Sequence, residues 1–187
     1  MIEALITSKT RIKLLVKFFL NSQSKSYLRK LVREINEAPN TIRVELMRLE
    51  NAGLLSSEHV KNRKYFFANT QHPFYIDIHS LVSKNLGINQ LTDQLSKHIT
   101  GLEAVYITGE IALGHDSKII DIVMVGQKLN NASISKMLLK TEKYITRKIR
   151  HIELTSEQME DYFHDKPAML IWEENTKDNE VGDNKAH

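Results

Sequence analysis

The feature that most constrains this chain is a proline, Pro39, placed between two short amphipathic stretches. Apolar side chains recur at helical spacing on both sides of it: Leu28, Leu31, Val32 and Ile35 before it, and Ile42, Leu46 and Leu49 after it. Proline disfavours helix in the residue before it and tolerates a new helical start. The sequence therefore predicts two helices, at residues 26–36 and 40–51, joined by a tight turn.

Cap residues extend this pattern in both directions. Ser26 can cap the first of these helices, and Gly53 suits the left-handed position that ends the second. An earlier helix is predicted from a cap at Thr7 or Ser8 to about Leu20.

Two strand-prone runs follow, at residues 54–58 and 65–68, and the stretch between them ends in the basic residues 61–64. We interpret this as a hairpin with a basic wing at residues 59–64. Three short helices followed by such a hairpin is the order of a winged helix-turn-helix, a DNA-binding unit whose last helix lies in the major groove.

The polar face of the predicted third helix carries the candidate base contacts: Asn40, Thr41, Arg43, Val44, Met47 and Arg48. We expect Arg43 to pair with guanine, Asn40 with adenine, and Thr41 or Val44 to touch a thymine methyl group. Other basic side chains suit phosphates, which set affinity and register without reading sequence. These are Arg29, Lys30, Arg48, Lys61, Arg63 and Lys64.

Residues 8–80 resemble the winged-helix regulators of the ArsR-like and MarR-like kind. Tyr27–Ile35 is similar to the second helix of that family, and Asn40–Leu55 to its recognition helix and the start of its wing. Members usually bind palindromic sites as homodimers, so the resemblance implies double-stranded DNA as a partner and a homodimer. The metal-binding cysteines and histidines of some members have no counterpart here. We therefore expect no metal and no cofactor, and leave open a small-molecule or nucleotide effector.

The second half of the sequence alternates between helix and strand patterns. Helices are predicted at about 74–86 (ended by Gly87), 90–99, 133–148 and 155–163, and strands at 103–108, 118–125, 151–154 and 169–172. Thr155 and Gln158 match a capping box. The fold class predicted is α+β, with a winged helix at 1–73, a connector helix at 74–89, a small α/β domain at 90–172 and a disordered tail at 173–187.

Residues 105–126 resemble the small nucleotidyltransferases, which carry a Gly-Ser pair opening a helix and an Asp-x-Asp on the next strand. The matching residues are Gly109, Ala112, Gly114 and Asp121. In that family the Gly-Ser turn grips nucleotide phosphates and the carboxylates hold divalent metals. The resemblance implies a nucleotidyltransferase-like fold with a vestigial nucleotide site at Gly109, Glu110 and Asp121.

The departures from the family pattern fall on the chemistry. Glu110 stands at the serine position, where its charge would repel a triphosphate, and Ile119 replaces the first carboxylate of the pair. Glu153, on a later strand, is a weak candidate for a third carboxylate. Isolated carboxylates make a poor magnesium site. We therefore expect no catalytic residue in this domain and no enzymatic activity. His115 and Asp116 lie in a loop with no evident nucleophile, and we assign them no site.

Charge is distributed unevenly along the chain. Residues 1–80 hold 13 Lys and Arg against 7 Asp and Glu, whereas residues 81–187 hold 13 against 16. A basic first part suggests that only this part faces a polyanion, although chance segregation of solvated charges gives the same count. The absence of cysteine excludes disulfides and thiolate chemistry. With no signal peptide or membrane-length apolar run, we expect a cytoplasmic protein that contacts no membrane.

Three functions remain open from the sequence. The leading hypothesis is a sequence-specific DNA-binding transcriptional regulator whose second domain dimerises or senses an effector. The alternative is a nucleotidyltransferase with a winged-helix targeting module. That alternative needs a metal site, to which Ile119 offers no ligand. A third reading is an interaction protein whose domains only dock partners.

Overall fold

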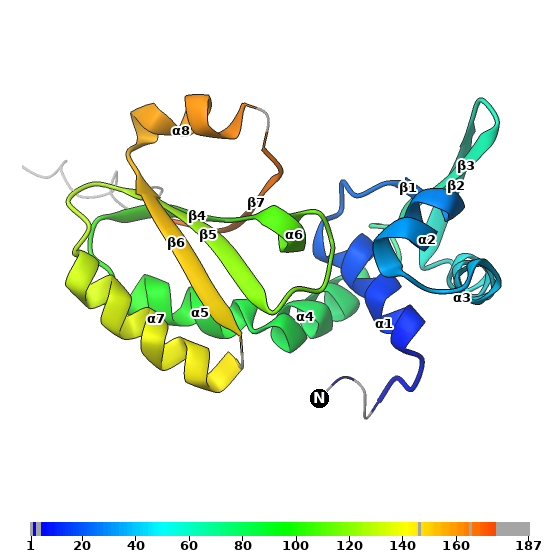
Figure 1. Ribbon diagram of the computed structural model, residues 1–187, viewed down its shortest axis with the longest axis horizontal. Coiled ribbons are helices and arrows are strands. Elements are labelled where there is room, and N and C mark those ends of the chain that lie inside the picture. The colour runs from blue at the N-terminus through cyan, green and yellow to red at the C-terminus, as the bar shows by residue number, and fades with distance from the viewer. Residues whose placement is uncertain (1, 3–4, 146, 165, 175–187) are drawn as a thin grey trace, which may run out of the picture.

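The computed structural model describes residues 2, 5–145, 147–164 and 166–174 of the 187-residue chain (Figure 1). Its elements follow in this order: α1 (Lys9–Leu15), the π-helix η2 (Val16–Leu20), β1 (Ser26–Tyr27), α2 (Leu28–Ile35), α3 (Pro39–Asn51), β2 (Leu55–Val60), β3 (Arg63–Ala68), α4 (Tyr75–Leu86), α5 (Ile88–His98), β4 (Leu102–Thr108), α6 (Gly109–Ala112), β5 (Ile119–Gly126), α7 (Asn131–Ile145), β6 (Lys148–Leu154), α8 (Ser156–Phe163) and β7 (Ala168–Glu173). The chain is of the α+β class. Within the described ranges, no helix has the length and apolar character needed to cross a membrane.

The first helix begins as predicted, and the second does not. Ser8 caps α1, because its Oγ accepts a hydrogen bond from the Arg11 backbone N–H at 3.2 Å. Ser26, expected to cap α2, instead lies in strand β1 opposite Phe66, and its side chain is fully buried. The pairing with β3 satisfies the backbone of β1, so α2 begins two residues later without a side-chain cap.

Helix α3 confirms the prediction from Pro39. The proline occupies its first turn, and the helix continues to Asn51. Gly53 takes a left-handed φ of 72°, which lets the Leu54 N–H reach back to the Leu49 carbonyl at 3.0 Å. This turn directs the chain from α3 into the wing.

The wing is a three-stranded antiparallel sheet with strand order β1-β3-β2. Its strands are longer than predicted, because Val60 pairs with Arg63 and leaves a turn of only Lys61 and Asn62. Arg63 and Lys64 therefore belong to β3 rather than to the tip. Helix α1, strand β1, helices α2 and α3, and the hairpin of β2 and β3 follow one another in the order of a winged helix-turn-helix.

The second sheet has four strands in the order β6-β5-β4-β7. Strands β5 and β6 are parallel, and the other neighbours are antiparallel. Helices α5 and α7 cover one face and α8 the other (Figure 1). This mixed sheet, with the short helix α6 between β4 and β5, confirms the alternation of helices and strands expected from the sequence.

The largest differences from the predicted boundaries in this half lie between α7 and β6, and one cap is confirmed. Helix α7 ends at Ile145, and strand β6 begins at Lys148. The Glu142 carboxylate stabilises this early end, because it accepts a hydrogen bond from the Ile149 N–H at 2.8 Å and pairs with Lys148. The capping box of Thr155 and Gln158 is present at the start of α8. Strand β7 includes residue 173, the first residue of the expected tail, and 175–187 lie outside the described residues.

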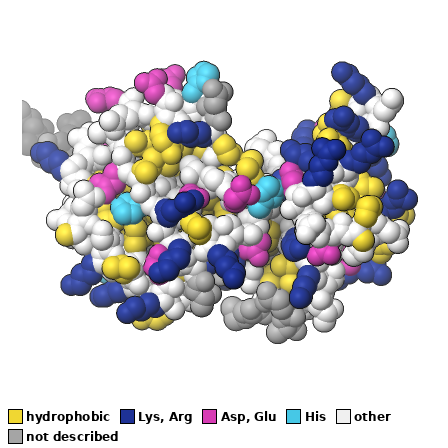
Figure 2. All heavy atoms as spheres, in the orientation of Figure 1, with side chains coloured by type: hydrophobic (Ala, Val, Ile, Leu, Met, Phe, Trp, Pro, Cys, Tyr) yellow, Lys and Arg dark blue, Asp and Glu magenta, His cyan; other side chains and the backbone are white. Residues whose placement is uncertain are grey.

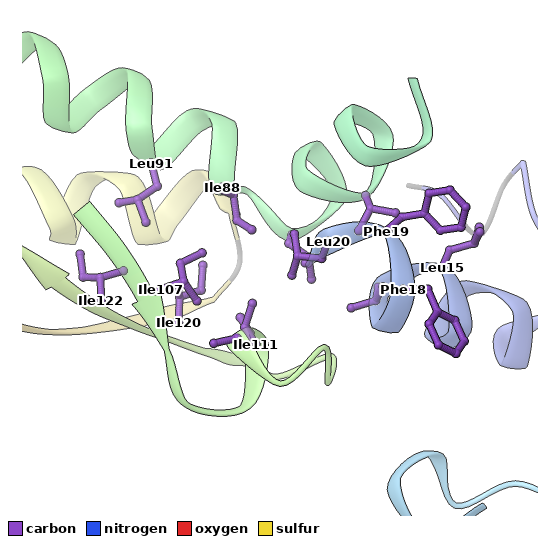
Figure 3. Close-up of a cluster of buried hydrophobic side chains, with 14 of the residues drawn as sticks. Leu15, Phe18, Phe19, Leu20, Ile88, Leu91, Ile107, Ile111, Ile120 and Ile122 are labelled. Carbon is purple, nitrogen blue, oxygen red and sulfur yellow. The ribbon is translucent and has the colours of Figure 1, made fainter. Parts of the chain in front are cut away.

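One hydrophobic core joins the two halves (Figure 3). Phe18 and Phe19 of η2 are fully buried, and Leu20 lies at the junction with α4 and α5. The π-helix also directs Lys17 inward, where its Nζ donates to the Leu113 carbonyl at 2.6 Å and lies 3.1 Å from Glu34. Apolar burial and this buried cation therefore hold the helix-turn-helix against the second sheet.

Candidate nucleic-acid interface

Helix α3 buries one face and exposes the other, as its sequence predicts. Ile42, Leu46 and Leu49 are 0%, 1% and 5% exposed. All six candidate base contacts are at the surface: Asn40, Thr41, Arg43, Val44, Met47 and Arg48. Lys and Arg side chains gather over the wing and the neighbouring end of the molecule, with apolar side chains between them (Figure 2). No described part of the chain covers this face, which insertion into a major groove requires.

The basic residues of this surface fall into two groups according to their partners. Arg29, Arg43 and Lys61 are exposed and, among the described residues, form no ion pair. Lys61 projects from the wing turn with a φ of 53°. These three cations are free to meet phosphates or base edges.

The other cations already have partners. Arg48 lies 3.2 Å from Glu45, Lys30 3.7 Å from Glu34, and Lys64 2.8 Å from Glu50. The Arg63 guanidinium lies 4.6 Å from the centroid of the Tyr27 ring. A paired cation contributes less net charge to a polyanion site than a free one, and the sequence pattern does not reveal these pairings.

Two buried or half-buried carboxylates organise these contacts. Burial alone would raise the pKa of Glu45, but hydrogen bonds from Arg11 and Ser8 and the charge of Arg48 lower it below its ordinary value. For Glu50, the hydrogen bond from Lys64 is the largest cause that lowers the pKa. Both groups are therefore charged at neutral pH and fix α3 to α1 and to the wing.

A groove of about 720 Å³ lies between α2, α3 and the wing. Sequence reasoning named its four basic residues and Met47 as contacts. It did not assign a contact to the six other lining residues: Tyr27, Leu28, Leu46, Glu50, Asn62 and Phe66. Sequence reasoning also left out Arg33, an exposed residue one helical turn after Arg29. Their spacing of four residues was a signal in the sequence for a basic face of α2.

In the second half, the structure brings Gly109 and Asp121 together. Thr108 pairs with Asp121 across β4 and β5, and Gly109 follows with a φ of 64°. A Cβ atom on Gly109 would lie 2.7 Å from the Asp121 carboxylate. Glu110 turns to His115 instead, with 2.6 Å between its Oε2 and the ring Nδ1.

Asp121 is held by an arginine. Arg150, its register partner on β6, donates to the carboxylate through Nε at 2.6 Å and Nη2 at 2.9 Å. The hydrogen bond to Asp121 also raises the pKa of Arg150. Glu153 does not join Asp121 as a further carboxylate, so that expectation was wrong. Glu153 is the register partner of Met124. Because side chains alternate along a strand, Glu153 lies on the opposite face of the sheet from Asp121.

His115 lies at the junction of the two halves, and Asp116 pairs within the second half. His115 Nε2 is 3.6 Å from Glu34 of α2, and Asp116 is 2.9 Å from Arg147. Among the described residues no three histidine, aspartate or glutamate side chains converge as metal ligands.

No family model matches this chain, and no curated protein matches it either. Among solved structures, a mutant of the MntA–HpeT toxin–antitoxin is similar at 14% identity with a TM-score of 0.38, over 46% of this chain and 72% of that one. A protein from Sulfolobus solfataricus assigned as a nucleotidyltransferase is similar at 23% identity with a TM-score of 0.36, and the match covers 51% of this chain and 86% of that one.

A longer match is BpsR of Bordetella bronchiseptica, whose structure concerns regulation of DNA binding by 6-hydroxynicotinic acid. Its identity is 15% and its TM-score 0.34, over 76% of this chain and 80% of that one. These scores are too low to place the chain in a family.

Proposed function

We propose that this protein is a sequence-specific DNA-binding transcriptional regulator. Helix α3 enters the major groove, the basic wing contacts the flanking backbone, and a homodimer presents two such units to a palindromic site. The observation that carries the proposal is the exposed outer face of α3, where Arg43 has no carboxylate partner among the described residues. To read guanine, a recognition helix needs an arginine whose guanidinium N–H groups are not already paired with a carboxylate.

We further propose that the second half, about residues 90–172, performs no nucleotidyl transfer. Arg150 occupies both oxygens of Asp121, and Ile119 supplies no ligand. A carboxylate with a bidentate arginine has little remaining capacity for Mg²⁺, which relies on carboxylates and substrate phosphates. This half then serves dimerisation or the sensing of an effector, with residues 74–89 as the connector.

The experiment is selection of preferred sites from a random DNA pool, followed by binding measurements on the selected and on scrambled duplexes. We predict that Arg43→Ala weakens binding to the selected site by about 1–3 kcal/mol and relaxes preference at one base pair. Lys140→Ala is the matched control, because Lys140 is an exposed lysine on α7 in the other half. A palindromic consensus supports the dimer.

Equal affinity for selected and scrambled DNA, or an equal loss in both variants, contradicts the proposal. Incubation with labelled nucleoside triphosphates and Mg²⁺ tests the alternative. Transfer of label that Asp121→Asn abolishes would make the chain a nucleotidyltransferase.

A further inference from the structure

We propose that a cavity at the junction of the two halves binds an uncharged monosaccharide. The cavity encloses about 400 Å³, within the roughly 300–1,000 Å³ of sites that hold small organic molecules. It lies between the turn after η2, helices α4 and α5, and strand β7. Neither α3 nor the wing lines it, so the inference does not depend on the proposed function.

The lining of the cavity is polar but carries no formal charge. Seven of its twelve residues have polar side chains, and none of the twelve is a lysine, arginine, aspartate or glutamate. A charged ligand would lose its hydration without gaining a partner of opposite charge. A hydrocarbon would leave the polar groups of the lining without hydrogen bonds. The lining therefore selects an uncharged molecule that is rich in hydroxyl groups.

Two side chains of the lining have hydrogen-bonding groups to spare. Ser83 of α4 is only 4% exposed, and its hydroxyl forms no hydrogen bond with any described residue. The Asn89 carboxamide at the start of α5 forms none either. A serine hydroxyl both donates and accepts, and a carboxamide does so through separate atoms. A sugar hydroxyl, which also donates and accepts, satisfies either group.

The fourth side of the argument is the pair of rings on α4. Burial lowers the pKa of His79 below its ordinary value, and a hydrogen bond with the Leu20 backbone only partly opposes this. The imidazole is therefore neutral at neutral pH, with one donor and one acceptor nitrogen. The Tyr75 ring lies beside it, with 6.3 Å between the ring centroids. A sugar ring has an apolar C–H face that can pack on Tyr75 while its hydroxyls reach His79 and Ser83.

Both halves of the chain contribute to the cavity. Leu20 and Asn21 line it from the first half, and residues 169–171 of β7 line it from the second. Figure 3 shows Leu20 and Ile88, two of its apolar lining residues, at this junction. Because the cavity forms only when the halves are packed together, a bound sugar should stabilise the folded chain.

The test is calorimetric titration of the full chain with D-glucose, D-galactose and D-ribose. We expect saturable binding of at least one of them. Ser83→Ala and Asn89→Ala should each weaken that binding roughly threefold to tenfold, because each removes one hydrogen bond. Ser80→Ala and Gln90→Ala are the matched controls, since they lie on the same two helices but outside the lining.

Charged forms of the same sugars provide the second measurement. Glucose 6-phosphate, galactose 6-phosphate or ribose 5-phosphate should bind about tenfold more weakly than the parent sugar, because no cation lines the cavity. Tighter binding of the phosphate would place the ligand beside Arg150 and Lys166, in a different pocket, and overturns the proposal. Equal losses in the test and control variants overturn it as well. So does the absence of saturable binding for all three sugars up to about 50 mM.

Discussion

At the scale of single residues, the carboxylates decide which cations face solvent. Glu45 is 5% exposed in the interior face of α3 and holds Arg11 at 2.8 Å and Arg48 at 3.2 Å. A buried carboxylate is tolerated only when it is paired and hydrogen-bonded. Glu45 therefore links α3 to α1 and fixes the position of α3 on the helix that precedes it in the fold.

We predict that Glu45→Gln lowers the free energy of unfolding by about 1–3 kcal/mol at pH 7, since charge-assisted hydrogen bonds are lost. The pKa of Glu45 is lowered in the folded state, so its stabilisation is present above the ordinary value of 4.5 and is lost as the pH falls through the folded pKa. Urea denaturation at several pH values should show the difference between variant and wild type shrinking in acid. Glu160→Gln, at an exposed position of α8, is the control. A difference that stays constant down to acid pH would contradict this role.

At the scale of elements, the wing and α3 are joined by an ion pair rather than by apolar packing alone. Lys64 of β3 meets Glu50 of α3, which also accepts from the Ser57 hydroxyl of β2. The turn residue Lys61 makes no such contact among the described residues. Lys64 therefore supports the position of the wing, whereas Lys61 has no ion pair among the described residues.

We predict that Lys61→Ala reduces the slope of log Kd against log salt concentration by about one, as expected for one phosphate contact. The double variant Glu50→Gln/Lys64→Ala removes a neutral pair and should leave the slope nearly unchanged. Titrations at four or more salt concentrations provide the comparison. Equal losses of slope would mean that Lys64 leaves Glu50 when DNA binds.

At the scale of the whole molecule, the helix-turn-helix is packed against the second sheet. Gly114 has a φ of 79°, and a Cβ atom there would lie 2.8 Å from the backbone of Lys17. Lys17 in turn bridges Leu113 and Glu34. With one core across this junction, the halves are expected to unfold together.

We predict that Gly114→Ala destabilises the protein by more than Gly53→Ala. Both glycines have left-handed φ values, which cost another residue about 1–2 kcal/mol, but at Gly53 the nearest atom to a Cβ is 3.5 Å away. Trp172, the single tryptophan, reports on β7 during urea denaturation, and circular dichroism reports on the helices. Both signals should shift together, even for Gly53→Ala in the other half. Separate transitions would show that the halves unfold independently.

Local sequence determined most of the elements and the two faces of α3. Helical spacing, Pro39 and Gly53 fix that helix, because its period and its ends depend on neighbours within a few residues. The same holds for the capping box at Thr155. Gly109, in contrast, lies beside Asp121 because β4 pairs with β5. Sequence alone also predicted the α+β class.

Only the tertiary structure decided which charges are free. Ser26 became a strand residue because β3, forty residues away, offers an unpaired edge. Arg150 reaches Asp121, and Lys64 reaches Glu50, because strand pairing and the wing turn bring distant residues together. Hydrophobic periodicity records which side of an element is buried, whereas the partner of a charged side chain depends on which other elements pack beside it.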